Sequence, residues 1–106
     1  MFARSVSCHL KPGRTAEFTT TLEKDILPVL RKQKGFQDEI TFVASNGTDA
    51  IGISLWDMKE NAEAYARGSY ASVLKTMEPV VEGTPQVHSY EVCNSTFHKI
   101  AARTTV

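Results

Sequence analysis

Hydrophobic and polar positions alternate with a period of two in four segments of the chain, which is the pattern of strands with two different faces. The predicted strands are Phe2–Leu10, Phe36–Ser45, Ala50–Trp56 and Gln86–Cys93. The Asn46-Gly47 dipeptide lies between the second and third strands and is a strong hairpin signal. These two strands should therefore pair directly.

Apolar residues recur at helical spacing after the first strand. Phe18, Leu22 and Ile26 form one stripe of an expected helix over Arg14–Lys34. Pro28 lies late in this stripe, so it should kink the helix or start a new turn.

A second helical region should follow the third strand. Asp57 and Glu60 have the spacing of a capping box, which predicts that Asp57 caps this helix. Gly68 should break it, and a further amphipathic stretch, Tyr70–Met77, should follow.

The resulting order, β-α-β-β-α-α-β, predicts an α+β protein with a ferredoxin-like, four-stranded antiparallel sheet and its helices on one face. The other face also carries apolar residues, since Phe36, Ile40 and Phe42 alternate with Thr41 and Val43. A large exposed apolar face is unfavourable, so we expect a two-fold symmetric homodimer that covers it. We expect one domain over residues 1–94, with a tail over 95–106 that packs on the partner or is mobile.

The composition and charge of the chain argue against two classes of protein, nucleic-acid binders and membrane proteins. Of 106 residues, 42% are hydrophobic, and 12 basic residues balance 12 acidic residues to give no formal net charge. A general nucleic-acid binder needs a basic excess, so we expect no nucleic-acid partner. No apolar run approaches a membrane span and the start does not read as a signal peptide, so we expect no membrane partner and a cytoplasmic location.

The third strand is the most informative segment for function. Its aliphatic face opposes a face made of Gly52, Ser54 and then Trp56, the only tryptophan of the chain. Two small residues beside a tryptophan suggest a floor with space above it, and so a small-molecule pocket. The alternative is that Trp56 is simply a core aromatic residue.

At this point the chain resembles the antibiotic biosynthesis monooxygenase domains, which are small dimeric α+β barrel proteins. The resemblance covers residues 2–92 and rests on Lys11-Pro12-Gly13, Phe18, Ile26-Leu27-Pro28-Val29-Leu30, Lys34-Gly35-Phe36, Ile53-Ser54-Leu55-Trp56-Asp57, Tyr65, Ser69 and Tyr70. It implies a pocket between the helices and the sheet, near Trp56. The family is functionally mixed, so these motifs indicate the fold better than the activity.

The resemblance implies that the chain is a monooxygenase that oxidises a quinol or polycyclic phenol with O2 and uses no cofactor, neither metal nor flavin. Heme-degrading relatives use an Asn on the first strand, a Trp and a His. Here Phe2–Leu10 contains no Asn, and Tyr65 and Lys75 occupy the other two positions. Heme degradation is therefore a weaker alternative, and a non-catalytic binding or sensing module with the same pocket is another.

Six residues are candidates for the site. Trp56, Tyr65 and Tyr70 would position an aromatic substrate, and Arg4 would face a cavity, an anionic ligand or an ion-pair partner such as Asp38.

His9 and His88 are expected at the same end of the sheet. Either would accept a proton, or the two form only a surface or interface pair. Neither strand supplies further ligands, so we expect no metal site.

Overall fold

The structure is a computed structural model that describes residues 1–96, so all but the first two residues of the expected tail lie outside the described residues. The elements are β1 (Phe2–Leu10), α1 (Thr15–Thr21), the π-helical segment η1 (Leu22–Ile26), α2 (Leu27–Arg31), β2 (Phe36–Val43), β3 (Asp49–Trp56), α3 (Lys59–Arg67), α4 (Tyr70–Met77) and β4 (Val81–Glu91). No helix within the described range is long and apolar enough to cross a membrane.

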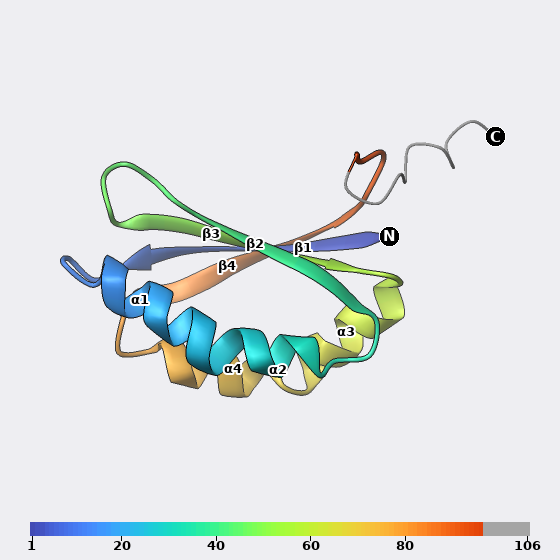
Figure 1. Cartoon of the computed structure of the whole chain (residues 1–106), viewed down its shortest axis with the longest axis horizontal. Coiled ribbons are helices and arrows are strands. Elements are labelled where there is room, and N and C mark those ends of the chain that lie inside the picture. The colour runs from blue at the N-terminus through green and yellow to red at the C-terminus, as the bar shows by residue number, and fades with distance from the viewer. Residues whose placement is uncertain (97–106) are drawn as a thin grey trace.

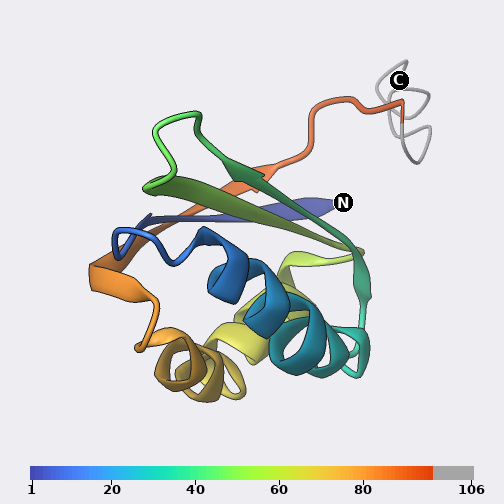
Figure 2. The same ribbon diagram turned by 60° about the vertical axis from the view of Figure 1, so that its left-hand side comes forward.

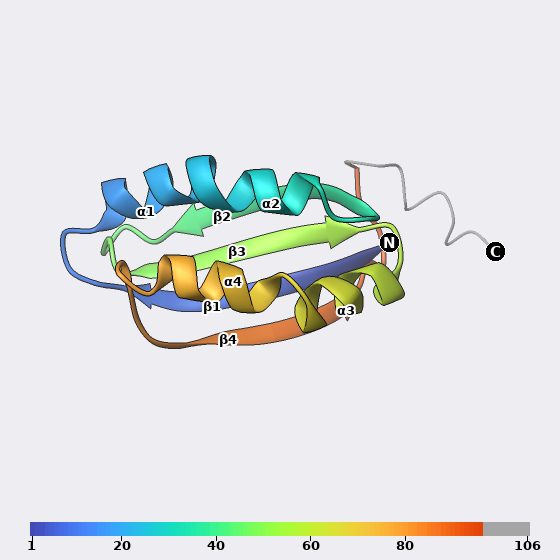
Figure 3. The same cartoon turned by 90° about the horizontal axis from the view of Figure 1, so that it is seen from below.

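All four strands form one antiparallel sheet in the order β2-β3-β1-β4. The helices lie together on one face of this sheet, as the two perpendicular views show (Figures 1 and 3). The opposite face carries no helix (Figure 2). The α+β, ferredoxin-like fold class is therefore confirmed, with β1 in the centre as its position in the order requires.

The last strand is longer than its sequence pattern predicts, beginning at Val81 and not at Gln86. Gly83 and Pro85 suggest a loop, but β4 is an edge strand, where both residues are tolerated. The pairing with β1 shifts between Ser7 and His9, and Gly83 takes a positive φ of 67° inside this irregularity. The apparent loop is thus a bulged part of the strand.

The first helical region is continuous but not uniform. Its middle turn, Leu22–Ile26, is π-helical, and Pro28 follows in the first turn of α2. Proline has no N–H to donate to the preceding turn, so the regular α-helical ladder cannot run through this position. The predicted irregularity is present, and it takes the form of a wider turn before the proline.

A bulge changes which side of the sheet Phe36 occupies. The pairing of β2 with β3 shifts between Phe36 and Asp38. Phe36 therefore packs edge-on against Trp56 under the helices, with ring centroids 5.6 Å apart. Ile40 and Phe42 lie on the opposite face and are exposed. The expectation that Phe36 shares their face is wrong, because one extra residue reverses the alternation.

Asp57 does not cap α3, which is a second correction. The N-cap is Met58 and the cap makes no side-chain hydrogen bond. Asp57 instead accepts a hydrogen bond from the Asn61 amide at 2.8 Å, and its backbone N–H donates to the carbonyl of Gly35 at 2.9 Å. Asp57 thus joins the loop before β2, through its backbone N–H, to the first turn of α3, through its carboxylate.

Gly35 is the tightest point of this junction. Its φ is +81°, and a Cβ there would collide with the side chains of Asp57 and Asn61. Gly13 also has a positive φ, of +74°, but a Cβ there would meet nothing within 4 Å. Substitution of these two glycines therefore distinguishes the cost of backbone strain alone, at Gly13, from the cost of strain plus a steric collision, at Gly35.

We predict that Gly35→Ala lowers the free energy of unfolding by about 3 kcal/mol or more, whereas Gly13→Ala costs about 1 kcal/mol, because only the first adds a collision to the strain. Urea denaturation of both variants checks this. Equal decreases in the free energy of unfolding for the two variants would mean that the side chains of Asp57 and Asn61 move aside at little cost.

Candidate functional site

A cavity of about 100 Å³ lies between the helices and the sheet. Its floor comes from all four strands and its roof from both helical regions. It is lined by Arg4, Val6, Cys8, Phe18, Leu22, Ile26, Leu30, Glu39, Thr41, Gly52, Ser54, Tyr65, Tyr70, Val73, Leu74, Met77, Val81 and Pro85. Leu22 and Ile26 come from the two ends of the π-helical turn, so this irregular turn directly shapes the roof.

The space exists because the middle strand carries small residues. Two rows of paired residues cross the floor, one through Ser54 and one through Gly52. Arg4 and Glu39 flank Ser54 in the first row, and Val6 and Thr41 flank Gly52 in the second. The sequence-based expectation of an open floor above Gly52 and Ser54 is confirmed.

Arg4 is the most unusual residue of the cavity, because it is charged and only 5% exposed. Its guanidinium lies 3.9 Å from the ring centroid of Tyr70 and 5.4 Å from that of Tyr65. No carboxylate of the described part of the chain forms an ion pair with it. The expected ion pair with Asp38 is absent, since Asp38 belongs to a row on the other face of the sheet.

Tyr65 and Tyr70 meet because the chain bends between α3 and α4. Gly68 ends α3 with a non-helical conformation, and the two rings then lie 5.9 Å apart. Tyr65 is buried and Tyr70 is half-buried, so one belongs to the core and the other lies nearer solvent. Burial, partly offset by the nearby Arg4 charge, raises the pKa of Tyr65 to about 12, so its hydroxyl stays protonated at neutral pH.

Trp56 lies behind the cavity and is not part of its lining. It is fully buried and its ring stacks on Tyr65 at a centroid distance of 5.3 Å. Its indole N–H donates to Ser54 Oγ at 2.9 Å. Of the two expectations for Trp56, the structure agrees with the core residue: its side chain contacts Tyr65 and Ser54 and does not line the cavity.

His9 and His88 are not neighbours, contrary to expectation. His9 pairs with Glu82 and His88 pairs with Ser5, four residues away along β1, which is about 13 Å. The register of the β1–β4 pairing sets this offset, because His88 pairs with Ser5 in the regular part of the ladder, before the bulge. Both side chains lie on the helix-free face, and neither lines the cavity. Their catalytic role stays a prediction that requires a site on that face.

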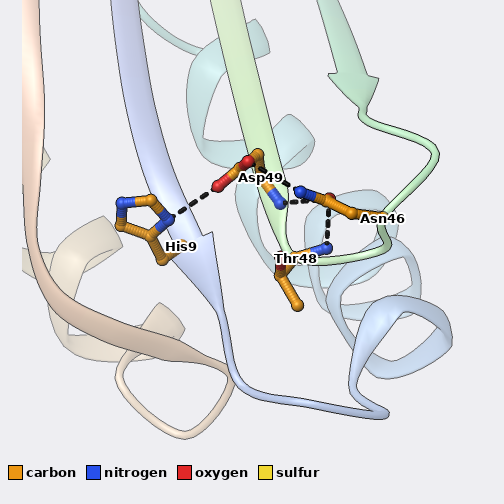
Figure 4. Close-up of polar contacts among 4 residues, drawn as sticks. All are labelled: His9, Asn46, Thr48 and Asp49. Atoms are coloured by element: carbon orange, nitrogen blue, oxygen red, sulfur yellow. Dashed lines mark hydrogen bonds and ion pairs between the residues drawn. The ribbon is translucent and has the colours of Figure 1, made fainter.

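His9 has a structural partner instead (Figure 4). Its Nδ1 lies 2.7 Å from Asp49 Oδ1, and the Asn46 amide donates to Asp49 Oδ2 at 2.8 Å. The hydrogen bond from Asn46, and then that from His9, lower the pKa of the Asp49 carboxyl. These contacts fasten the hairpin between β2 and β3 to the end of β1.

Glu39 is the cavity residue that sequence reasoning missed. It is half-buried, it accepts a hydrogen bond from Thr41 Oγ1, and burial raises the pKa of its carboxyl. The available signal was its position: Glu39 and Thr41 alternate with Ile40 and Phe42, so they had to face the helices. Among residues 1–96 no group of three or more His, Cys, Asp or Glu residues is placed to hold a metal.

The cavity continues toward solvent between α4 and β4. A second hollow of about 380 Å³ shares Leu74, Met77, Val81 and Pro85 with it. Pockets for drug-sized ligands hold roughly 300–1,000 Å³, so the inner cavity suits about one aromatic ring and a larger ligand would extend into the outer hollow. Arg4 lies in the inner part and Lys75 borders the outer part.

Comparisons with known proteins point to one fold. The sequence matches no protein-family model and no curated protein. A putative antibiotic biosynthesis monooxygenase from Bordetella bronchiseptica superposes with a TM-score of 0.73 at 16% identity, covering 86% of this chain and 95% of that one. The chain has the fold of the antibiotic biosynthesis monooxygenase proteins. The resemblance seen in the sequence is confirmed at this level.

Two further structures share this fold. SnoaB, a cofactor-independent oxygenase from Streptomyces nogalater, has a TM-score of 0.69 at 13% identity and covers 91% of this chain and 97% of its own. MhuD, solved with two manganese protoporphyrin IX molecules per active site, has a TM-score of 0.74 at 14% identity and covers 91% and 98%. At these identities the likeness establishes the fold alone.

We predict that Gly52→Val blocks the cavity without unfolding the protein. The new side chain would start about 3.4 Å from Glu39 Oε2 and project into the open space, while valine is a good strand residue. Binding of 4-nitrophenol, followed by quenching of the single Trp56, should weaken at least tenfold. Ile51→Val, on the opposite face of the same strand, is the control and should bind normally.

Proposed function

We propose that this protein is a cofactor-independent monooxygenase that oxidises an electron-rich aromatic compound, such as a quinol or polycyclic phenol, with O2. The observation that carries the proposal is the cavity beneath the helices, where Arg4 lies beside Tyr70 and forms no ion pair with any carboxylate of residues 1–96. A cation in an apolar cavity stabilises negative charge that develops on a bound ligand. The fold shared with SnoaB supports the same reaction class.

The chemistry needs only a substrate that can become an anion. Removal of a proton leaves the electron pair on the substrate, which then passes one electron to O2. The substrate radical and superoxide combine to a peroxide, which takes up a proton. Breaking the O–O bond while the carbon loses its remaining hydrogen gives a carbonyl group and water, so one oxygen atom enters each product.

A binding or sensing module with the same cavity is the alternative. A cavity lined only by aliphatic groups would favour it, because such groups cannot move protons. Here Arg4, Glu39, Tyr65 and Tyr70 border the space, and this set of polar groups supports turnover. Heme degradation has less support, since neither His9 nor His88 borders the cavity to ligate iron.

Oxygen uptake tests this proposal directly. We expect the protein, stripped of metal by a chelator, to consume O2 with at least one member of a panel of anthrones and quinols. Gly52→Val should lower the rate at least tenfold, because it fills the cavity, and Ile51→Val should not.

Uptake that disappears with the metal would contradict cofactor independence. A normal rate in Gly52→Val would place the reaction elsewhere. If no compound supports oxygen uptake but 4-nitrophenol still binds, the result would favour the binding module over the enzyme. A shift of the Soret band on addition of hemin would favour heme handling.

We also propose that a second copy of the chain covers the helix-free face of the sheet. Ile40, Phe42, Ile51 and Tyr90 lie on this face and are 41–55% exposed. The small residues Ser5 and Ser7 lie between them on β1, which leaves the centre of the face shallow. A contiguous apolar surface of this kind is characteristic of an interface.

The oligomeric state checks this second proposal. The wild-type chain should sediment as a dimer, and Phe42→Asp should sediment as a monomer, because a charge would be buried in the interface. Met58→Asp changes a residue that is equally exposed, at 54%, but lies at the start of α3, so it should remain dimeric. A wild-type monomer would contradict the proposal.

A further inference from the structure

Arg4 carries a charge that the described protein does not neutralise. The guanidinium is buried against two tyrosine rings, and within residues 1–96 no ion pair or side-chain hydrogen bond involves it. A buried charge without a partner is costly, and cation–π contacts with Tyr65 and Tyr70 offset only part of that cost. An anionic group on a bound ligand would offset the rest of that cost.

Glu39 supplies the only carboxylate among the described residues that border the cavity. The titratable residues that border the space are Arg4, Cys8, Glu39, Tyr65 and Tyr70. Burial raises the pKa of both the Cys8 thiol and the Tyr65 phenol, so both stay protonated, and arginine is always a cation. The carboxylate of Glu39 remains, and burial raises its pKa as well, toward the range useful for a general base.

Arg4 and Glu39 occupy opposite sides of one row of the floor. Ser54 pairs with both of them, so their backbones are two strand spacings apart, about 10 Å. No direct ion pair joins the two side chains: Arg4 reaches up to Tyr70, and Glu39 bonds to Thr41. Glu39 also borders a separate surface hollow, whose other charged lining residues are Arg31 of α2 and Asp38 of its own strand.

We propose that the ligand is an aromatic compound with an acidic hydroxyl, that Glu39 takes the proton of this hydroxyl, and that Arg4 holds the resulting anion. The inference rests on the proposed function and assigns the proton acceptor and the anion-binding residue of the same cavity. The O–H bond of the ligand breaks, its electron pair stays on the oxygen, and the proton moves to a Glu39 carboxylate oxygen. The net charge of the site is unchanged, because the negative charge moves from Glu39 to the ligand beside Arg4.

Binding of a coloured phenol tests the anion site without any turnover. The phenolate of 4-nitrophenol absorbs in the visible range, so the ionisation of the bound molecule is read directly. In the wild-type protein, the bound phenol should ionise at a lower pH than in solution, because Arg4 favours the anion. In Arg4→Met it should ionise at a higher pH than in solution, because an apolar cavity disfavours charge, and phenolate affinity should fall at least tenfold.

Two controls separate this effect from a change in structure. Methylated 4-nitroanisole cannot ionise, so Arg4→Met should not weaken its binding. Arg4→Met should also unfold at the same or a higher urea concentration than wild type, since it replaces a buried charge by an apolar side chain of similar length. If the variant instead fails to fold, Arg4→Lys provides the test: it keeps the charge and should keep the preference for phenolate over nitroanisole.

The role of Glu39 is tested by the pH dependence of oxygen uptake. Glu39→Gln should bind 4-nitrophenolate as tightly as wild type or more tightly, because it removes a like charge. Its oxygen uptake at neutral pH should fall at least tenfold, and the loss should disappear at a pH where the substrate ionises in solution. A merely structural role would not produce this recovery at high pH.

Several results would overturn the inference. Equal binding of phenolate and nitroanisole by the wild-type protein would remove the anion site. Full oxygen uptake by Glu39→Gln would mean that another group accepts the proton. A comparable loss of uptake in His88→Ala, with recovery at high pH, would identify His88 as that group. If no substrate supports uptake at all, the proposed reaction fails, while the colour of bound nitrophenol still decides whether Arg4 selects the anion.

Discussion

The structure is organised around one stack of side chains that joins the sheet to the helices. Trp56 at the end of β3 packs on Tyr65 of α3, Tyr65 lies beside Tyr70 of α4, and the guanidinium of Arg4 from the central strand covers both tyrosines. The aromatic part supplies apolar burial at the core, whereas the cation introduces a cost that packing alone does not remove. The cavity lies beside this stack and is lined by Arg4, Tyr65 and Tyr70.

The location of the cavity follows from residue size as much as from charge. Gly52 and Ser54 place almost no volume above the middle strand, and the π-helical turn directs Leu22 and Ile26 over that gap. Larger residues at these positions would close the core and increase burial. The core is therefore less densely packed around the cavity, which is typical of ligand-binding sites, where a bound ligand fills the space.

The two faces of the sheet have different roles in the proposals. The face under the helices holds the charged groups Arg4 and Glu39 beside the cavity, and the helix-free face presents exposed aliphatic and aromatic residues, which the proposed dimer would cover. The strict alternation along β2 produces both properties from one segment, since Glu39 and Thr41 face inward while Ile40 and Phe42 face outward. A change of register would exchange them.

Local patterns determined much of this protein. The period of two, the Asn46-Gly47 turn and the helical stripe around Phe18 were sufficient for the fold class and the element order, because these signals depend on neighbours along the chain. They also placed small residues before Trp56 and a charge at Arg4. Element ends were less certain, and β4 extends five residues earlier because an edge strand accepts Gly83 and Pro85.

Only the tertiary structure decided which of these residues meet. The bulge near Phe36 shifts the β2–β3 register and moves Phe36 into the core, and the register of β1 with β4 separates His9 from His88. The indole N–H of Trp56 donates to Ser54, and only the placement of residues 1–96 shows that none of their carboxylates forms an ion pair with Arg4. Such pairings arise between strands far apart in sequence, so no local pattern in the chain contains them.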